Sequence, residues 1–249
     1  TSFTTPALTA TTTYYVETEN ASGCVSSSRV AVKVTVTPIS TGLSCNAATA
    51  QQSGIDGLCL LCGVDNPEAS TDANATNFTS IHLAVGVGAT GYQRLIFANP
   101  GIATDSIRID IENPNGLLDL ALLGGITAKV MNGANDVISY PLNSSLLTLR
   151  LLGGNRAKVT IPASAVYDRV EIRFGALVSA LSSLNIYGAE VIYPNPTVAA
   201  TGQAICSGST TTLTATANGG TTLKWYAAAS GGAALATGGT FTTPALTAN

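Results

Sequence analysis

Apolar and polar residues alternate with a period of two over much of the chain. Isoleucine occupies every second position of 107–111, with charged residues between, and DRVEIRF at 168–174 repeats the alternation. This is the pattern of a strand with one buried face and one solvent-exposed face, as in antiparallel sheets. Turn signals such as NPNG and MNGAND separate such runs. The pattern predicts an all-β protein.

The middle of the chain, residues 39–193, contains about ten such runs and no helical period of useful length. This number of expected strands, without a helix, predicts a central two-sheet sandwich of the jelly-roll kind. The expected strands are 58–64 (LCLLCGV), 80–87, 92–98, 105–112, 117–123, 127–131, 136–140, 146–152, 156–161, 168–174 and 184–193.

Within this central unit, LLGGITAKV at 122–130 is echoed by LLGGNRAKV at 151–159, with seven of nine positions identical. We interpret the pair as a duplicated strand-turn-strand. A phosphate-binding glycine loop is excluded, because no helix follows and no Lys-Ser or Lys-Thr pair closes it.

The two ends of the chain share the octapeptide FTTPALTA, which begins at Phe3 and again at Phe241, an offset of 241 − 3 = 238 positions. An identity of this length indicates a tandem repeat, and the chain then spans slightly more than one period. We expect residues 1–38 and 194–249 to be complementary parts of one domain of about 80 residues. Its short strands recur every 8 to 12 residues, the spacing of an immunoglobulin-like (Ig-like) sandwich.

Read across the repeat boundary, ICSGSTTTLTATANGGTTLKWY from the C-terminal end continues into FTTPALTATTTYYVETENASGC from the N-terminal end. This sequence resembles the Ig-like repeats of very large secreted surface adhesins of Bacteroidota, including those of gliding bacteria. The resemblance implies a C-terminal part of one repeat (1–38), a separate β-sandwich (39–193) and an N-terminal part of the next repeat (194–249). It also implies an extracellular or cell-surface location and adhesion as the function.

The charge and hydropathy of the chain exclude several classes of protein. Only 10% of the residues are charged, the net charge is −3 and the mean hydropathy is +0.32. The chain therefore lacks the basic footprint of a nucleic-acid-binding protein and the high charge of a disordered one. No uninterrupted apolar run approaches the roughly 18 residues of a membrane-spanning helix. Low charge leaves little repulsion between copies, which favours assembly.

The five cysteines favour an oxidising, extracellular setting. Cys59 and Cys62 form a C-x-x-C inside an apolar run, where a strand would point them to opposite faces. We therefore expect a disulfide from Cys45 to either Cys59 or Cys62, with the other thiol buried. The 238-residue offset places the partners of Cys24 and Cys206 in adjacent repeats; two free buried thiols are the alternative.

The polar segment DNPEASTDANATNF at 65–78 supplies hard oxygen ligands of the kind calcium prefers. With a late glutamate it resembles the calcium loop of discoidin-like or galactose-binding-like sandwiches. The resemblance implies a structural calcium, for which the candidate ligands are Asp65, Asn66, Asp72, Asn74 and Glu190. A solvated loop without metal is the alternative.

Further candidate chemistry is sparse. The single histidine, His82, lies on an expected strand without a nucleophile in a recognisable context, so we expect no enzymatic activity. Asp105-Ser106-Ile107 matches a Bacteroidota O-glycosylation pattern that would place a glycan on Ser106. Four tyrosines could serve a sugar site, although nothing in the sequence groups them: Tyr92, Tyr140, Tyr167 and Tyr187.

The leading hypothesis is a structural and adhesive unit of an extracellular filament or giant adhesin. Its partners would be copies of itself or adjacent repeats of the same chain, bound head to tail. The alternative is a carbohydrate-binding module that recognises surface polysaccharide and uses the Ig-like parts as spacers. No cofactor is expected apart from the possible calcium.

Overall fold

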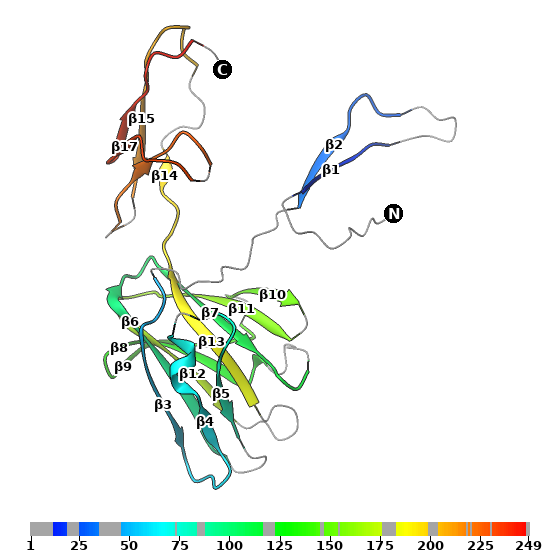
Figure 1. Ribbon diagram of the computed structural model, residues 1–249, viewed down its shortest axis with the longest axis vertical. Helices are drawn as coiled ribbons and strands as arrows, with labels where there is room; N and C mark the ends of the chain where they lie inside the picture. Colours follow the sequence, from blue (N-terminus) through cyan, green and yellow to red (C-terminus); the bar gives the residue numbers. More distant parts are fainter. Residues whose placement is uncertain are drawn as a thin grey trace. The chain divides into compact units, whose positions relative to one another are not determined.

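The computed structural model is built almost entirely of antiparallel strands, so the all-β prediction is confirmed (Figure 1). Thr1–Thr41 and Gly42–Asn249 form two separate units. The structure describes residues 12–18, 25–34, 46–72, 74–83, 88–116, 123–144, 147–153, 155–175, 183–198, 204–217, 219, 221–229 and 231–247.

In the described part of the N-terminal unit, β1 (Thr12–Val16) and β2 (Val30–Val34) form a hairpin. The register pairs Tyr14 with Val32 and Val16 with Val30, so these four side chains share one face. At the end of the hairpin Arg29 donates from Nε to Glu17 at 2.7 Å. A two-stranded hairpin has no second layer of its own to cover an apolar face.

The central unit is a sandwich of two antiparallel sheets, which confirms the predicted architecture. One sheet has the order β10-β11-β7-β13-β5-β4 and the other the order β3-β6-β12-β8-β9. The strands are β3 (Ala50–Asp56), β4 (Gly63–Asp65), β5 (Thr79–His82), β6 (Thr90–Gly101), β7 (Ser106–Glu112), β8 (Ile126–Asn132), β9 (Asn135–Pro141), β10 (Thr148–Gly153), β11 (Arg156–Pro162), β12 (Tyr167–Gly175) and β13 (Ser183–Ile192). The short 3₁₀ helix η1 (Pro67–Ser70) follows β4.

The core lies between the sheets and is formed by the apolar positions of the alternating runs. The isoleucines of β7 are fully buried, and on β12 so are Val170, Ile172 and Phe174. Phe97 and Tyr167 pack edge to face, with ring centroids 5.8 Å apart. The alternation thus predicted the buried faces of β7 and β12 correctly.

The echoed nonapeptides lie in opposite sheets. β8 carries ITAKV in the five-stranded sheet and β11 carries RAKV in the six-stranded sheet. In both strands the Ala and Val positions are buried in the core, while Lys129 and Lys158 are on the outward side. The same local pattern therefore produces the same in-and-out alternation on both sides of the sandwich.

The chain enters and leaves the sandwich at the same end. Val191 N–H donates to the carbonyl of Asn46, and Ala48 N–H donates to that of Ala189, both at 2.9 Å. The connection from β3 to β4 lies at the opposite end, beyond the Asp56–Thr90 and Gly63–His82 pairs (Figure 1). The sandwich is consequently attached at one end only.

The predicted strand at 58–64 is wrong. Only Gly63 and Val64 of this run are in a strand, β4, and residues 57–62 form a turn that crosses from one sheet to the other. Gly57 has a φ of +93°, a left-handed conformation that ends β3. An apolar run normally indicates burial, but here its leucines lie at the surface.

The C-terminal segment forms a three-stranded sheet and a small hairpin. The sheet has the order β14 (Thr197–Val198), β15 (Thr212–Thr216) and β18 (Thr240–Thr242), and the hairpin pairs β16 (Lys224–Trp225) with β17 (Ala236–Thr237). Trp225 stacks on Phe241 at 5.8 Å, and its indole N–H donates to the carbonyl of Gly238 at 2.9 Å.

Candidate functional site

The outward face of the five-stranded sheet carries two rows of side chains that belong to strands far apart in sequence. Antiparallel register places them directly opposite one another across neighbouring strands. Across β3, β6, β12 and β8 one row is Gln52, Arg94, Glu171 and Lys129, and the next row is Gly54, Tyr92, Arg173 and Thr127.

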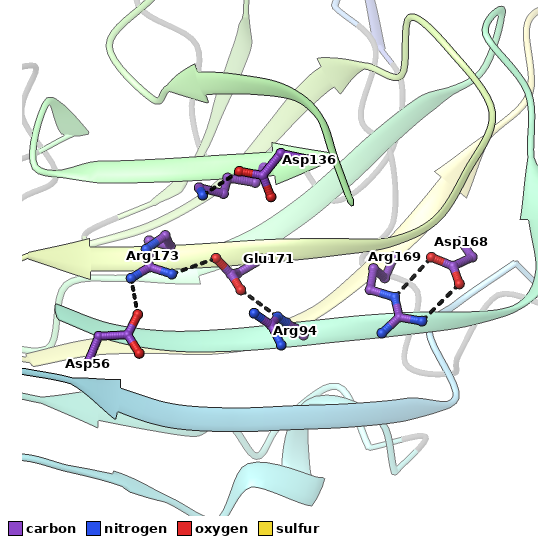
Figure 2. A network of polar contacts seen from close by, with 8 residues as sticks. Asp56, Arg94, Asp136, Asp168, Arg169, Glu171 and Arg173 are labelled. Carbon is purple, nitrogen blue, oxygen red and sulfur yellow. Dashed lines mark hydrogen bonds and ion pairs between the residues drawn. The ribbon is translucent and has the colours of Figure 1, made fainter. Parts of the chain in front are cut away.

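A buried carboxylate organises the charges of this face (Figure 2). Glu171 is 1% exposed and accepts from Arg94 on one side and from Arg173 Nη1, at 2.9 Å, on the other. Arg173 also donates to Asp56 from its second nitrogen. Burial alone would lower the pKa of Arg173, but hydrogen bonds to Asp56 and Glu171 raise it above its ordinary value. Both arginines are thereby held in one geometry by hydrogen bonds to carboxylates.

The charges of this face balance. Besides the three-strand network, Lys129 pairs with Asp136 at 2.6 Å and Arg169 pairs with Asp168 at 2.9 Å. Among the described residues of this face, four cationic side chains thus pair with four carboxylates. A surface with paired charges offers many hydrogen-bonding groups without a strong net field.

Tyr92 lies flat against this sheet because its neighbour on β3 has no side chain. A Cβ on Gly54 would come within 2.8 Å of the Tyr92 hydroxyl oxygen and 3.0 Å of its Cζ. The guanidinium carbons of Arg94 and Arg173 lie 4.8 and 5.8 Å from the ring centroid. An aromatic ring laid on a sheet among fixed polar groups is an arrangement that can stack on a flat ligand. We call Gly54, Tyr92, Arg94 and Arg173 the Tyr92 platform.

The six-stranded sheet carries a second aromatic group, which is already occupied. Arg156 stacks on Tyr187 at 3.4 Å from the centroid, and Phe78 packs on the same ring at 5.4 Å. The Tyr187 hydroxyl donates to Glu112 Oε2 at 2.6 Å. Burial opposes ionisation of Glu112, but hydrogen bonds from Tyr187 and Asn185 outweigh it and lower its pKa. Burial and the hydrogen bond to Glu112 raise the pKa of Tyr187 to about 12.

The other two tyrosine candidates are structural. Tyr167 is fully buried, its ring lies over Gly101, and burial raises its pKa well above the ordinary value. Tyr140 is 5% exposed and shares a hydrogen bond with Ser164 at 3.1 Å. Of the four tyrosines suggested by the sequence, only Tyr92 therefore lies in a setting suited to a ligand.

The structure does not bring the five calcium candidates together. Glu190 pairs with Arg108 at 2.7 Å, whereas Asp65 pairs with His82 at 3.1 Å. Asp65 lies opposite Ser80, which lies opposite Asn185, so Asp65 and Glu190 are separated by roughly 16 Å along β13. The set Asp65, Asn66, Asp72, Asn74 and Glu190 is therefore not one site.

The individual ligands of the polar loop are engaged in local bonds. Asp72 accepts from Asn74 N–H at 2.9 Å and from Asn77 at 2.6 Å, and Asn74 accepts from Thr76. Asn66 begins η1 in a left-handed conformation, and its carbonyl accepts from Thr79. Within the described ranges no three His, Cys, Asp or Glu side chains group as a metal site.

The disulfide prediction needs correction, because Cys59 bonds to Cys62. A strand would have separated the two side chains, but a turn brings their Cα atoms to 5.5 Å. Cys45, the expected partner, and Cys24 lie outside the described residues. Cys206 has a free, exposed thiol, so its proposed bond to an adjacent repeat stays a prediction.

Two further predicted positions are half-buried strand residues. Ser106 begins β7 with its side chain on the outward face, next to the buried Asp105, so glycosylation there stays a prediction. His82 ends β5 with 39% of its side chain exposed.

The terminal segments leave apolar faces uncovered. On the hairpin face of β1 and β2, Val16 is 55% exposed, Val30 64% and Val32 50%. The apolar positions of β15 and β18, Leu213 and Phe241, are paired with each other and only partly buried. The hairpin thus has an apolar face without a layer that covers it, whereas in the C-terminal segment Trp225 packs on Phe241 and covers part of that face.

Both ends of the chain match one family model. Residues 1–38 and 194–249 together match the family described as Ig-like domain CHU_C associated. The two segments, separated by 155 residues of the chain (194 − 39 = 155), are therefore similar to parts of one Ig-like domain. No curated protein sequence matches the chain significantly.

Solved structures similar to this chain are β-sandwich carbohydrate-binding modules. A variant of the family 29 module CBM29-2 has 13% identity and a TM-score of 0.30, covering 59% of this chain and 85% of its own. CBM29_1 from Piromyces equi has 9% identity and a TM-score of 0.29, covering 58% and 87%. A structure described as explaining promiscuous specificity in the β-sandwich superfamily has 10% identity and a TM-score of 0.32, covering 73% and 74%. At this level the similarity concerns the sandwich architecture alone.

Sequence reasoning named Tyr92 but missed the residues around it. The spacing of Tyr92 and Arg94 predicts a shared face, as does that of Glu171 and Arg173. Nothing local indicates that β6 lies between β3 and β12, which is what puts Gly54 beneath the ring.

Proposed function

We propose that the chain is a structural and adhesive repeat unit of an extracellular bacterial surface filament or giant adhesin. The Ig-like module is completed between successive units: residues 194–249 of one unit receive residues 1–38 of the next. One observation carries the proposal. The two segments match a single Ig-like family model, and the hairpin of the first segment exposes an apolar face.

The physical reason for pairing is the burial of these faces. Val16, Val30 and Val32 are half or more exposed on the hairpin, and Leu213 of β15 and Phe241 of β18 are only partly buried in the other segment. Covering three valines in this way is worth several kcal/mol in total at about 25 cal/mol/Å². Because the donated and receiving surfaces differ, the contact is head to tail, and it forms an open filament when the rotation between units does not close a ring.

The proposal requires an extracellular location, which two observations favour. The Ig-like segments belong to a type that suggests a surface protein, and the Cys59–Cys62 disulfide fits an oxidising compartment. In the described part of the chain, no helix has the length and apolar character needed to cross a membrane.

The test is assembly of the purified chain, followed by light scattering across a concentration series and by electron microscopy. The wild type should form head-to-tail oligomers with an axial repeat. Val32→Glu should abolish them, because it places a charge on the apolar face. Ala31→Glu is the matched control, since residue 31 is the next position of β2 and faces the other way. Compact, isolated wild-type particles at every concentration would refute the proposal.

A second candidate function is recognition of surface polysaccharide by the central sandwich. The Tyr92 platform favours it, because an aromatic ring is laid flat among fixed donors and acceptors. The paired charges of the face favour a neutral polysaccharide over an anionic one. As part of this second candidate we propose that the loop at residues 65–74 binds calcium. Adding calcium or a chelator to the polysaccharide-binding assay tests this.

Affinity electrophoresis of the whole chain in gels containing neutral polysaccharides tests this second candidate. Tyr92→Ala should weaken binding at least about tenfold. Tyr193→Ala is the control, because Tyr193 is 46% exposed and lies outside the platform. Failure of the wild type to bind any polysaccharide refutes the function. Equal binding by wild type and Tyr92→Ala refutes the platform and leaves the function in place.

A further inference from the structure

The connection between β3 and β4 presents three leucines to solvent. Leu60 is 101% exposed, Leu58 91% and Leu61 77%, more than any other large apolar side chain in the described part of the chain. The Cys59–Cys62 disulfide closes the turn, and Cys62 packs against the core of the sandwich. The leucines are therefore held outward by a covalent brace. We call residues 58–62 the leucine loop.

The leucine loop stands at the end of the sandwich farthest from the chain's entry and exit. Entry and exit are paired through Asn46 and Val191, while the loop follows Asp56 at the far end of β3. β13 runs between the two ends over ten residues, roughly 30 Å (Figure 1). The loop is thus the distal tip of a domain attached at its other end.

The size of this tip argues against a stable protein interface. Three leucines offer roughly 200–350 Å² of apolar surface. A stable protein complex buries about 800 Å² of surface on each partner. Its interface also contains about one hydrogen bond per 100–200 Å². The exposed side chains of the tip are leucines, so insertion into a fluid hydrocarbon layer suits it better than a matched protein surface.

The surrounding charges indicate which lipid surface would fit. Residues 57–62 contain no Lys or Arg, and the carboxylates on either side, Asp56 and Asp65, are paired with Arg173 and His82. The tip therefore has no basic cluster that would attract anionic headgroups. A zwitterionic membrane is the surface that its chemistry matches.

We propose that the leucine loop inserts into the interfacial region of a zwitterionic lipid bilayer. One loop binds weakly and reversibly, as a short apolar anchor does. In a repeat array, which rests on the proposed function, many loops on one chain multiply this contact through effective concentration.

Flotation of the whole chain with phosphatidylcholine vesicles tests the proposal. The wild type should float with the vesicles, also at high salt. The double variant Leu60→Ser, Leu61→Ser should bind at least about tenfold more weakly. The double variant Leu149→Ser, Val166→Ser is the matched control, because these side chains are exposed elsewhere on the sandwich, and it should float like the wild type.

Two further variants test directly whether the leucine loop inserts into the bilayer. With Trp225→Phe as background, Leu60→Trp should show a blue shift of its emission only when vesicles are added. Cys59→Ser, Cys62→Ser should weaken binding several-fold, since an unbraced loop loses conformational entropy on insertion.

The opposite outcomes are equally clear. The proposal is overturned if the wild type stays unbound, if the Leu60→Ser, Leu61→Ser variant floats like the wild type, or if binding requires added phosphatidylglycerol. It is also overturned if the wild type dimerises without lipid and the same variant abolishes the dimer, because the leucines would then form a protein contact.

Discussion

At the scale of single residues, glycines decide how closely aromatic rings approach the sheets. Gly101 lies beneath the fully buried Tyr167, and a Cβ there would fall well inside van der Waals contact with the ring. Gly54 lies beneath Tyr92, but its nearest neighbour is the hydroxyl end of a half-buried side chain that can move. The same substitution should therefore have different costs at the two positions.

Gly101→Ala should destabilise the central sandwich by about 1–3 kcal/mol, because Tyr167 has no room to shift. Gly175→Ala is the control, since its Cβ would be 3.9 Å from Thr90 Oγ1, an ordinary contact. Urea unfolding monitored by circular dichroism measures both. Equal midpoints for the two variants would contradict the packing of Tyr167 on Gly101.

Tyr187 should make the protein sensitive to alkali. Its pKa is raised from 10.0 to about 12 in the folded chain, so the neutral phenol stabilises the fold. This contribution is fully present below pH 10 and is lost as the pH rises through 12. Wild-type stability should fall over that window, and Tyr187→Phe should show a shallower fall. Urea midpoints measured across the window, with absorbance titration of tyrosinate, give the comparison; parallel curves would contradict it.

At the scale of elements, a buried charge links three neighbouring strands. Glu171 on β12 pairs with Arg94 on β6, and Arg173 beside it reaches Asp56 on β3. The sequence predicts the outward position of Glu171 from the alternation of DRVEIRF. It does not predict that the side chain is 1% exposed, because the covering groups come from other strands.

Glu171→Ala should cost roughly 3 kcal/mol or more, because it leaves two arginines without their buried partner. Asp136→Ala should cost less than about 1 kcal/mol, since the Lys129–Asp136 pair is half-exposed. Thermal or urea unfolding of both variants measures the difference. Similar small losses in both would mean that the network contributes little to stability.

At the scale of the whole molecule, the proposed function depends on whether the two Ig-like segments of successive units combine. The hairpin exposes an apolar face, and the chain enters and leaves the central sandwich at one end. In an array this would leave both the Tyr92 platform and the leucine loop free to contact surfaces.

Assembly should be reinforced covalently if Cys206 of one unit bonds to Cys24 of the next. Separate units would then give a ladder of oligomers on a non-reducing gel, which reductant would collapse to monomer. Cys206→Ser should remove the ladder, whereas Cys59→Ser, Cys62→Ser should keep it, because that bond lies within the sandwich. A ladder that survives Cys206→Ser would contradict the pairing.

What the sequence determined by itself is local or repetitive. The period of two follows from the pleat of a strand, so the buried faces of β7 and β12 could be predicted from residues 106–112 and 168–174. The repeated octapeptide likewise related the two ends of the chain, which match one Ig-like family model, whereas their complementarity stays a prediction.

Tertiary structure alone decided which residues meet. Strand order placed Gly54 under Tyr92 and Arg94 beside Glu171, because strand pairing depends on how the whole core is buried. The same reason explains why the leucine loop is a turn and not a buried strand. Residues 58–62 are apolar enough for a buried strand, but both sheets were filled by other strands, and this segment became the turn between them.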